Sequence, residues 1–211
     1  MRLRRLLLVL VPTLACAPAS CGAASDNVQL ITAKGQQEML ANPGTDPVGA
    51  ANPDVVIVEY FDYNCPYCKR LVPALQAVLK QDPKVAIVYK EWPILGPVSE
   101  YAAASALAAG WQGKYLAAHD ALMSASGLTA NVAVDAALQK AGVNLDTLKA
   151  DRTRHAQEIT ALLARNDSEA HALSLSGTPG VVVGRLLTPG SPELDDLQKL
   201  IAYSRKSKPN Q

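Results

Sequence analysis

Cysteine and histidine are scarce in this chain. Its 211 residues contain four cysteines and three histidines, and Cys16 and Cys21 both fall within the first 24 residues. A structural zinc site needs four ligands, and His119, His155 and His171 do not stand at ligand spacing from one another or from the other cysteines. The composition therefore argues against a metal site and leaves one Cys-x-x-Cys pair to be explained.

Neither charge sign is in large excess. The net charge is +1, and it becomes −2 without residues 1–24, which hold three arginines and no acidic residue. Nucleic-acid-binding proteins carry a basic patch or stripe, so we expect no nucleic-acid partner. A hydrophobic content of 49% with 18% charged residues is typical of a globular core rather than of disorder. The length fits one domain, or one domain with an insertion.

The apolar run near the amino terminus is too short to span a bilayer. It follows three arginines and precedes a stretch rich in small residues between positions 17 and 24, which is the order of a secretory signal peptide. We predict a signal peptide over residues 1–24 and an exported, periplasmic protein. A lipid-anchored protein is the alternative, because small residues also precede Cys16 and Cys21.

The most informative stretch is a strand-like run that ends in Cys-x-x-Cys. Residues 55–61 are β-branched or aromatic apart from one glutamate, which predicts a buried strand. Pro66 follows Cys65, and proline suits the first position of a helix, where its missing N–H would have no partner anyway. The spacing therefore places Cys65 and Cys68 at a strand-to-helix junction, at the positive end of a helix.

This placement has chemical consequences. A helix amino terminus offers free N–H groups and a partial positive charge, so the pKa of Cys65 should fall below the free value of about 8.5. Cys65 would then be the attacking sulfur. Cys68 lies one turn further along, close enough to form a disulfide with Cys65, and would resolve a mixed disulfide.

A Cys-x-x-Cys motif does not by itself specify a redox pair. It can also be half of a zinc site or a small structural disulfide. The strand–turn–helix context favours a redox pair over both.

The residues resemble the DsbA-like family of thioredoxin-fold thiol–disulfide oxidoreductases. Five separated features carry the resemblance over roughly residues 50–205: Cys65-Pro66-Tyr67-Cys68, Glu59 six residues before Cys65, Pro73 five residues after Cys68, the segment Tyr89–Gly96, and Gly177-Thr178-Pro179 followed by Gly180–Val183. The combination is more specific than the cysteine motif alone.

The resemblance implies an α/β fold with a thioredoxin-like central sheet and an inserted helical domain. It implies that Glu59 is a buried acid that moves protons to and from Cys68, although a buried acid with no kinetic role remains the alternative. It also implies a cis Thr178–Pro179 bond that faces the cysteines and helps to hold the client chain. We place Pro66 and Tyr67 beside these in the client-binding site. No cofactor is required.

We expect six segments along the chain. They are a signal peptide (1–24), an amino-terminal helix and linker (25–53), the first part of the thioredoxin fold (54–97), a helical insertion (98–175), the second part of the thioredoxin fold (176–205) and a tail (206–211).

Details within these segments carry further expectations. The insertion should contain helices near 98–111, 113–125, 130–141, 145–151 and 152–174. Tyr101, Trp111 and Tyr115 are expected in helix-packing core, and the three histidines at the surface or between helices. Lys90 is expected to be solvated or to couple to Glu59. Residues 27–42 predict either a helix packed on its own domain or a dimerisation arm.

The function predicted is disulfide exchange with cysteines of client proteins, with donation of disulfides favoured over isomerase or reductase activity. Tyr67 and Thr178 depart from the family's strong oxidases and are nearer to its isomerases and reductases, which depend on a membrane redox partner. A binding module is the alternative: a chaperone-like protein, or one that holds Cu(I) through Cys65 and Cys68, since soft thiolates suit that ion.

Overall fold

The structure is a computed structural model and describes residues 28–41 and 44–207. In this part of the chain six strands form one mixed sheet in the order β1-β6-β5-β3-β4-β2. The central strands β3 (Val55–Phe61) and β4 (Val85–Glu91) are parallel, and the other neighbouring pairs are antiparallel. The predicted signal peptide lies outside the described residues.

Strand β3 and helix α2 (Pro66–Gln81) form the first half of a βαβ unit. Six of the seven β3 residues are buried, because helices cover both faces of the sheet. Side chains alternate along the strand: Ile57 and Phe61 join the core that includes α2, whereas Val58 and Tyr60 join a second core on the opposite face. The chain then returns as β4, parallel to β3.

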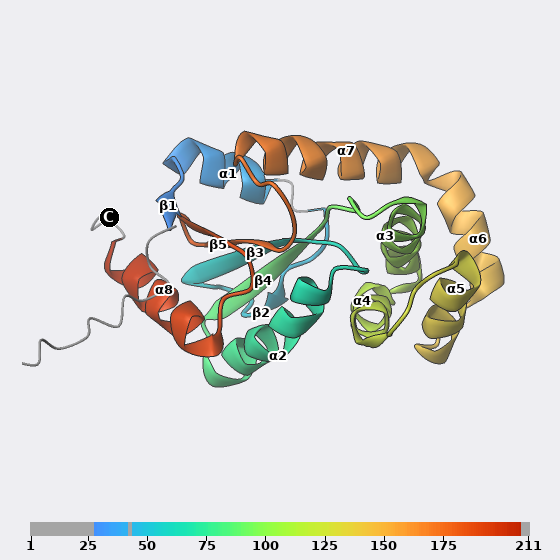
Figure 1. Cartoon of the computed structure of the whole chain (residues 1–211), viewed down its shortest axis with the longest axis horizontal. Coiled ribbons are helices and arrows are strands. Elements are labelled where there is room, and N and C mark those ends of the chain that lie inside the picture. Colours follow the sequence, from blue (N-terminus) through green and yellow to red (C-terminus); the bar gives the residue numbers. More distant parts are fainter. Residues whose placement is uncertain (1–27, 42–43, 208–211) are drawn as a thin grey trace, which may run out of the picture.

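Helices cover the two faces of the sheet in separate groups (Figure 1). Helix α2 and the carboxy-terminal α8 (Leu194–Lys206) lie on one face. Helix α1 (Ala33–Ala41) and the long α7 (Ala156–Ala172) run along the other. The cysteines belong to the face that α2 covers, since Cys65 and Cys68 join its core.

The chain between β4 and β5 is helical, as predicted. It forms α3 (Pro97–Ala109), a short 3-10 turn (Gly110–Gln112), α4 (Tyr115–Ser124), α5 (Asn131–Lys140), α6 (Leu145–Arg154) and α7. Helix α6 extends to Arg154, beyond its expected end at residue 151, and α7 begins at Ala156 rather than at residue 152.

One expectation in the insertion is wrong. Trp111 is 45% exposed rather than part of the core, and its ring stacks on His155 with centroids 3.9 Å apart. Among the described residues no helix is both long and apolar enough to cross a membrane.

The amino-terminal segment packs on its own sheet. Strand β1 (Gln29–Leu30) pairs with β6 (Leu186–Pro189), and the buried side chains of Ile31 and Met39 join the core on the α7 face. Gln36 also donates a hydrogen bond to the Gly184 carbonyl. The edge strand β2 (Val48–Gly49) follows, paired with β4.

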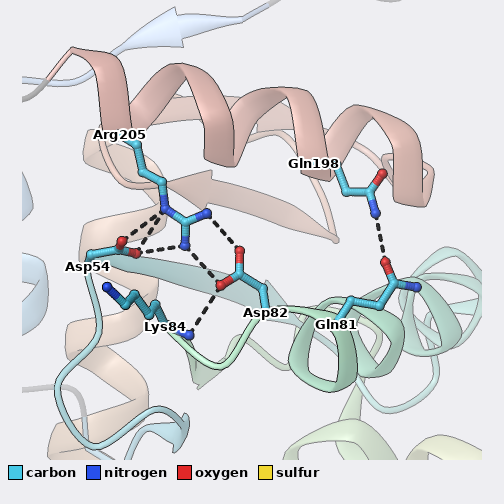
Figure 2. Close-up of polar contacts among 6 residues, drawn as sticks. All are labelled: Asp54, Gln81, Asp82, Lys84, Gln198 and Arg205. Atoms are coloured by element: carbon cyan, nitrogen blue, oxygen red, sulfur yellow. Dashed lines mark hydrogen bonds and ion pairs between the residues drawn. The ribbon is translucent and has the colours of Figure 1, made fainter.

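The last turn of helix α8 is fixed at the start of β3, the end of that strand remote from the cysteines. Figure 2 shows the Arg205 guanidinium between Asp54, just before β3, and Asp82, at the end of α2. Its nitrogens donate to both carboxylates at 2.8–3.1 Å. Gln198, earlier on α8, donates to Gln81. Charge-assisted, bidentate bonds of this kind fix geometry as well as adding stability.

Lys90 corrects another expectation. It is fully buried, faces α7 rather than Glu59, and forms an ion pair with Glu169. The Tyr60 hydroxyl donates to the same carboxylate at 2.9 Å. Because Tyr60 and Lys90 are partners across the sheet and side chains alternate, both point away from the face that holds Glu59.

Candidate active site

Cys65 is held at the start of α2 by the loop that follows β3. Its backbone N–H donates to the Asp62 carbonyl at 3.0 Å. The buried Asp62 carboxylate accepts from the Asn64 N–H (2.7 Å), the Ser99 hydroxyl (2.7 Å) and the Leu95 N–H (2.9 Å). This carboxylate ties the cysteine loop to the loop after β4.

The electrostatics at Cys65 match a reactive thiolate. Its pKa is lowered to about 5, mainly because the Cys68 thiol donates a hydrogen bond to it, with further hydrogen bonds from Thr178 and from the backbone N–H groups of Tyr67 and Cys68. Free N–H groups of this kind are the feature that a helix amino terminus offers. The largest of these contributions, the hydrogen bond from the Cys68 thiol, was not anticipated from the sequence.

Cys68 has the opposite character. It is fully buried, and its pKa lies far above its ordinary value because of burial, its hydrogen bond to Cys65 and the charge of Glu59. Both described cysteines are free thiols. The pair therefore consists of one thiol that ionises readily and one that keeps its proton.

Glu59 lies on the same face of β3 as Ile57 and Phe61 and is fully buried. Neither of its carboxylate oxygens has a hydrogen-bond partner among the described residues. Burial, with a smaller contribution from the Cys65 charge, raises its pKa to about 8. A carboxyl group in this setting is protonated at neutral pH and can release or accept a proton close to it.

The cis-proline loop comes to the same place. The Thr178–Pro179 bond is cis, as the resemblance implied, and the Cys65 thiol lies 3.2 Å from the Thr178 carbonyl oxygen. The next residue, Gly180, begins β5 (Gly180–Val183) and pairs with Tyr60 of β3. This register brings the loop to the carboxyl end of β3, where the cysteines follow.

The surface around the cysteines is partly apolar. Pro66 and Tyr67 are exposed, and the Arg70 guanidinium lies 4.3 Å from the centroid of the Tyr67 ring. Ile94 and Leu95, in the loop after β4, are 41% and 51% exposed. These two residues were not predicted as part of the site, although two consecutive aliphatic residues after a strand were a usable signal.

A buried polar cluster that was not predicted from the sequence lies beside the site. The hydroxyls of Tyr63 and Tyr115, the ring of His119 and the carboxylate of Glu91 lie together: Tyr115 donates to Glu91 at 2.6 Å, and the Tyr63 oxygen is 3.3 Å from His119 Nδ1. Burial lowers the pKa of His119 to about 3 and raises that of Glu91 to about 7. His119 is therefore a neutral, buried group with a partner.

Metal ligands do not gather here. Over the described ranges no group of three or more histidine, cysteine, aspartate or glutamate side chains is placed to hold a metal ion.

The arrangement defines the class: a thioredoxin-fold protein with a pair of free thiols at a helix amino terminus. Residues 56–202 match the model of the DSBA-like thioredoxin domain. The chain belongs to this family, whose members are thiol–disulfide oxidoreductases acting on cysteine-containing substrates.

Solved structures agree with this assignment. A thioredoxin-like oxidoreductase from Silicibacter pomeroyi DSS-3 is 40% identical with a TM-score of 0.77, over 81% of this chain and 98% of that one. The thiol-disulfide exchange protein alpha-DsbA2 from Wolbachia pipientis is 25% identical, with a TM-score of 0.73 over 81% and 94%. A periplasmic thioredoxin-like protein from Salmonella enterica serovar Typhimurium is 27% identical, with a TM-score of 0.72 over 85% and 100%.

The curated relatives are longer proteins. The chain is 30% identical over 166 residues to a protein named Na(+)/H(+) antiporter NhaA 1 from Salinispora arenicola, a match that covers 76% of this chain and 25% of the antiporter. A second antiporter, from Salinispora tropica, is matched over 21% of its length. The chain therefore spans a quarter or less of the curated relatives that it matches.

Proposed function

We propose that this chain is an exported thiol–disulfide oxidoreductase that exchanges disulfides with client proteins through Cys65 and Cys68. The observation that carries the proposal is the opposite shift of the two thiol pKa values. Cys65, at the start of α2, has a pKa lowered to about 5, whereas the buried Cys68 keeps its proton. A thiol that acts as nucleophile and leaving group needs a low pKa, whereas a resolving thiol can remain protonated at rest.

In the direction of disulfide donation, a client thiolate attacks the Cys65 sulfur of the oxidised pair. The Cys65–Cys68 bond breaks, a client–Cys65 bond forms, and Cys68 departs with the electron pair and takes a proton. A second client thiolate then attacks the client sulfur of the mixed disulfide. Cys65 leaves as a thiolate, the client gains a disulfide and the protein has gained two electrons. The low pKa of Cys65 makes it a good leaving group in this last step.

Glu59 is our candidate for the proton donor to Cys68. At neutral pH its carboxyl group is protonated, since its pKa is raised to about 8, and its charge is coupled to that of Cys68. When Cys68 departs, Glu59 can supply the proton and later recover it from solvent. In the reverse direction it would remove the proton from Cys68.

Client recognition is proposed at the rim of this site. A client in extended conformation would pair with the backbone at Thr178 and Pro179, a form of strand addition, and bring its cysteine to Cys65. Pro66 and Tyr67 would contact it on one side. The exposed Ile94 and Leu95 offer apolar contact, which fits clients whose cysteines are still flanked by unburied core residues.

Direction of electron flow follows from the potential of the pair. A thiolate stabilised in the reduced form makes the disulfide a stronger oxidant, so the pKa of Cys65 supports disulfide donation. Equilibration of the full chain with glutathione buffers tests this. A potential toward the roughly −120 mV of a strong oxidant supports donation, and one near or below about −200 mV would make the protein an isomerase or reductase.

A Cys65→Ser variant separates enzyme from binding module. We expect it to lose oxidation of a reduced, unfolded client completely, while it still folds. A variant that still protects the client from aggregation, together with a wild type that turns over no disulfides, would instead favour the chaperone-like alternative. Copper retained by the purified wild type under the same conditions would favour Cu(I) handling.

The finer points of the proposal concern location and assembly. We propose export by the signal at residues 1–24, periplasmic residence and a membrane redox partner that resets the dithiol, together with the six segments predicted from the sequence. The Salmonella neighbour is described as periplasmic. Because the apolar side of α1 packs on its own sheet, we favour a monomer over a dimer formed through residues 27–42. Cell fractionation and light scattering test location and assembly.

A further inference from the structure

Lys69, the residue after Cys68, makes an unusual set of contacts. Its ammonium group donates to three backbone carbonyls, those of Leu122 (2.7 Å), Met123 (3.2 Å) and Ala125 (2.8 Å). These carbonyls belong to the last turn and carboxyl cap of α4. An ammonium has three N–H donors and no acceptor, so its full hydrogen-bonding capacity is used by one helix end.

The end of α4 is electrostatically unfavourable for a thiolate nearby. The last four carbonyls of a helix have no partner within the helix and carry roughly half a negative charge between them. Two of the carbonyls that Lys69 binds, those of Leu122 and Met123, are in this set. A positive side chain at a helix carboxyl end stabilises the helix and cancels its partial charge.

The charged groups that face the dithiol can be counted on each neighbouring element. Besides each other, Cys65 and Cys68 interact with the carboxyl group of Glu59 from β3 and with the ammonium group of Lys69 from α2. The Asp62 backbone forms a hydrogen bond with Cys68, and the end of α4 is bound by the same ammonium group. The Thr178 loop contributes hydrogen bonds but no charge. The ammonium of Lys69 interacts with Cys65, Cys68 and Asp62, and the Glu59 carboxyl group is protonated at neutral pH. Within this set Lys69 is therefore the cationic side chain that offsets the Asp62 carboxylate and a helix end.

We propose that Lys69 is a positioning residue for the dithiol: it holds the carboxyl end of α4 and neutralises it, so that the Cys65 thiolate is stabilised although a helix end lies close by. The inference rests on the proposed function of Cys65 and adds a link from the active-site helix to the helical insertion. It also explains why a long cationic side chain stands directly after the resolving cysteine, turned inward rather than into solvent.

The test compares three variants of the full chain. Lys69→Met keeps the length of the side chain and removes the charge, whereas Lys69→Arg keeps the charge. Lys114→Met removes the same charge from the opposite end of α4, where Lys114 is the exposed residue before the first turn. The pH dependence of iodoacetamide alkylation is followed at Cys65 by peptide mass spectrometry, and the equilibrium with glutathione is measured in parallel.

We expect Lys69→Met to raise the pKa of Cys65 by about 0.5–1 unit, the size of a helix-end charge interaction. Because the reduced form loses that stabilisation, the disulfide should become about three- to tenfold harder to reduce, or about 15–30 mV more negative. Lys69→Arg and Lys114→Met should both stay within about 0.2 unit of the wild type, on the same scale of charge interactions.

Three results would overturn the inference: an unchanged Cys65 pKa in Lys69→Met, equal shifts in the Met and Arg variants at position 69, or an equal shift in Lys114→Met. An unchanged pKa would mean that Lys69 has no electrostatic effect on Cys65. Equal shifts in the Met and Arg variants would attribute the effect to the shape of the side chain, and an equal shift in Lys114→Met would attribute it to the net charge of the protein. A wild type in which Cys65 itself shows no lowered pKa would instead contradict the proposed function, so the two failures are distinguishable.

Discussion

Glu59 and Lys90 are both fully buried, ionisable and carried by the two central strands, but they lie on opposite faces of the sheet and differ in their polar partners. On the α7 face, the Lys90 ammonium pairs with Glu169, which also accepts from Tyr60. On the α2 face, Glu59 has no hydrogen-bond partner within the described chain. The α7 face satisfies its charge, whereas the α2 face keeps a carboxyl group that is more stable neutral.

The difference separates stability from chemistry. A buried charge is tolerated when it is paired and hydrogen-bonded, and removal of its partner is strongly destabilising. An unpaired buried acid responds by raising its pKa, which is a cost at neutral pH but leaves it able to exchange a proton with Cys68. The α7 face should therefore be the more sensitive to loss of a partner, and the α2 face should gain stability when its acid is removed.

The largest effect is expected from Glu169→Ala. The substitution leaves the Lys90 ammonium buried without its anion and the Tyr60 hydroxyl without its acceptor, so the free energy of unfolding should fall by about 3–5 kcal/mol. Urea unfolding followed by circular dichroism measures it. Glu158→Ala, on the same helix but with a side chain 68% exposed, should change stability by less than about 0.5 kcal/mol.

A double variant makes this prediction sharper. Lys90→Met added to Glu169→Ala removes the stranded charge and should recover a large part of the loss, because an apolar pair of similar volume is often as stable as a buried ion pair. If Glu169→Ala cost no more than its exposed control, or if Lys90→Met gave no recovery, the proposed contrast between the two faces would be wrong.

Glu59→Gln tests the other face. The pKa of Glu59 is raised from 4.5 to about 8, so the native state binds a proton that the unfolded state has released. The stability that this proton supplies is fully present below about pH 4.5 and is lost as the pH rises toward 8, by about 4–5 kcal/mol. The glutamine of the variant never ionises, so this loss should be missing from it.

The informative quantity is the difference between the wild type and Glu59→Gln as a function of pH. Glu91, whose pKa is raised to about 7, gives both proteins a similar background slope, and subtraction removes it. The variant should also resolve mixed disulfides more slowly, since the Cys68 thiol loses the carboxylate that would accept its proton before it attacks. A pH-independent difference in stability, with unchanged resolution, would leave Glu59 as a buried acid with no kinetic role.

Much of the site could be predicted from the sequence because its parts are local. The apolar run, the cysteines and Pro66 occupy one stretch, and the physics of a helix amino terminus predicted a lowered pKa for Cys65, which is confirmed. The cis bond before Pro179 is confirmed as well, but that expectation depended on the family resemblance. No rule about single residues would have found it.

The misses all involve partners far away in the sequence. Lys90 meets Glu169, 79 residues later, and Lys69 meets the end of α4 more than 50 residues later. Neither pairing has a periodic signal, because each depends on how the helical insertion docks on the sheet. Trp111 was expected inside for its size, but the 3-10 turn after α3 places it at the surface against His155.

The smallest effect is expected at the far end of the sheet, where Arg205 joins Asp54 and Asp82 (Figure 2). All three side chains are 24–36% exposed, so solvent screens them and Arg205→Ala should cost only about 1–2 kcal/mol. Gln198, also on α8, has a neutral, exposed partner in Gln81. Gln198→Ala should therefore lower the free energy of unfolding by less than about 0.5 kcal/mol.

The sign of the pH dependence distinguishes this site from Glu59. Hydrogen bonds from Arg205 lower the pKa of Asp82, so its contribution is present above the ordinary aspartate pKa and is lost as the pH falls through the lowered one. The wild type and Arg205→Ala should therefore converge in acid, whereas the wild type and Glu59→Gln should diverge as the pH rises to 8. If Arg205→Ala stayed equally destabilised in acid, side-chain packing rather than charge would join α8 to the sheet.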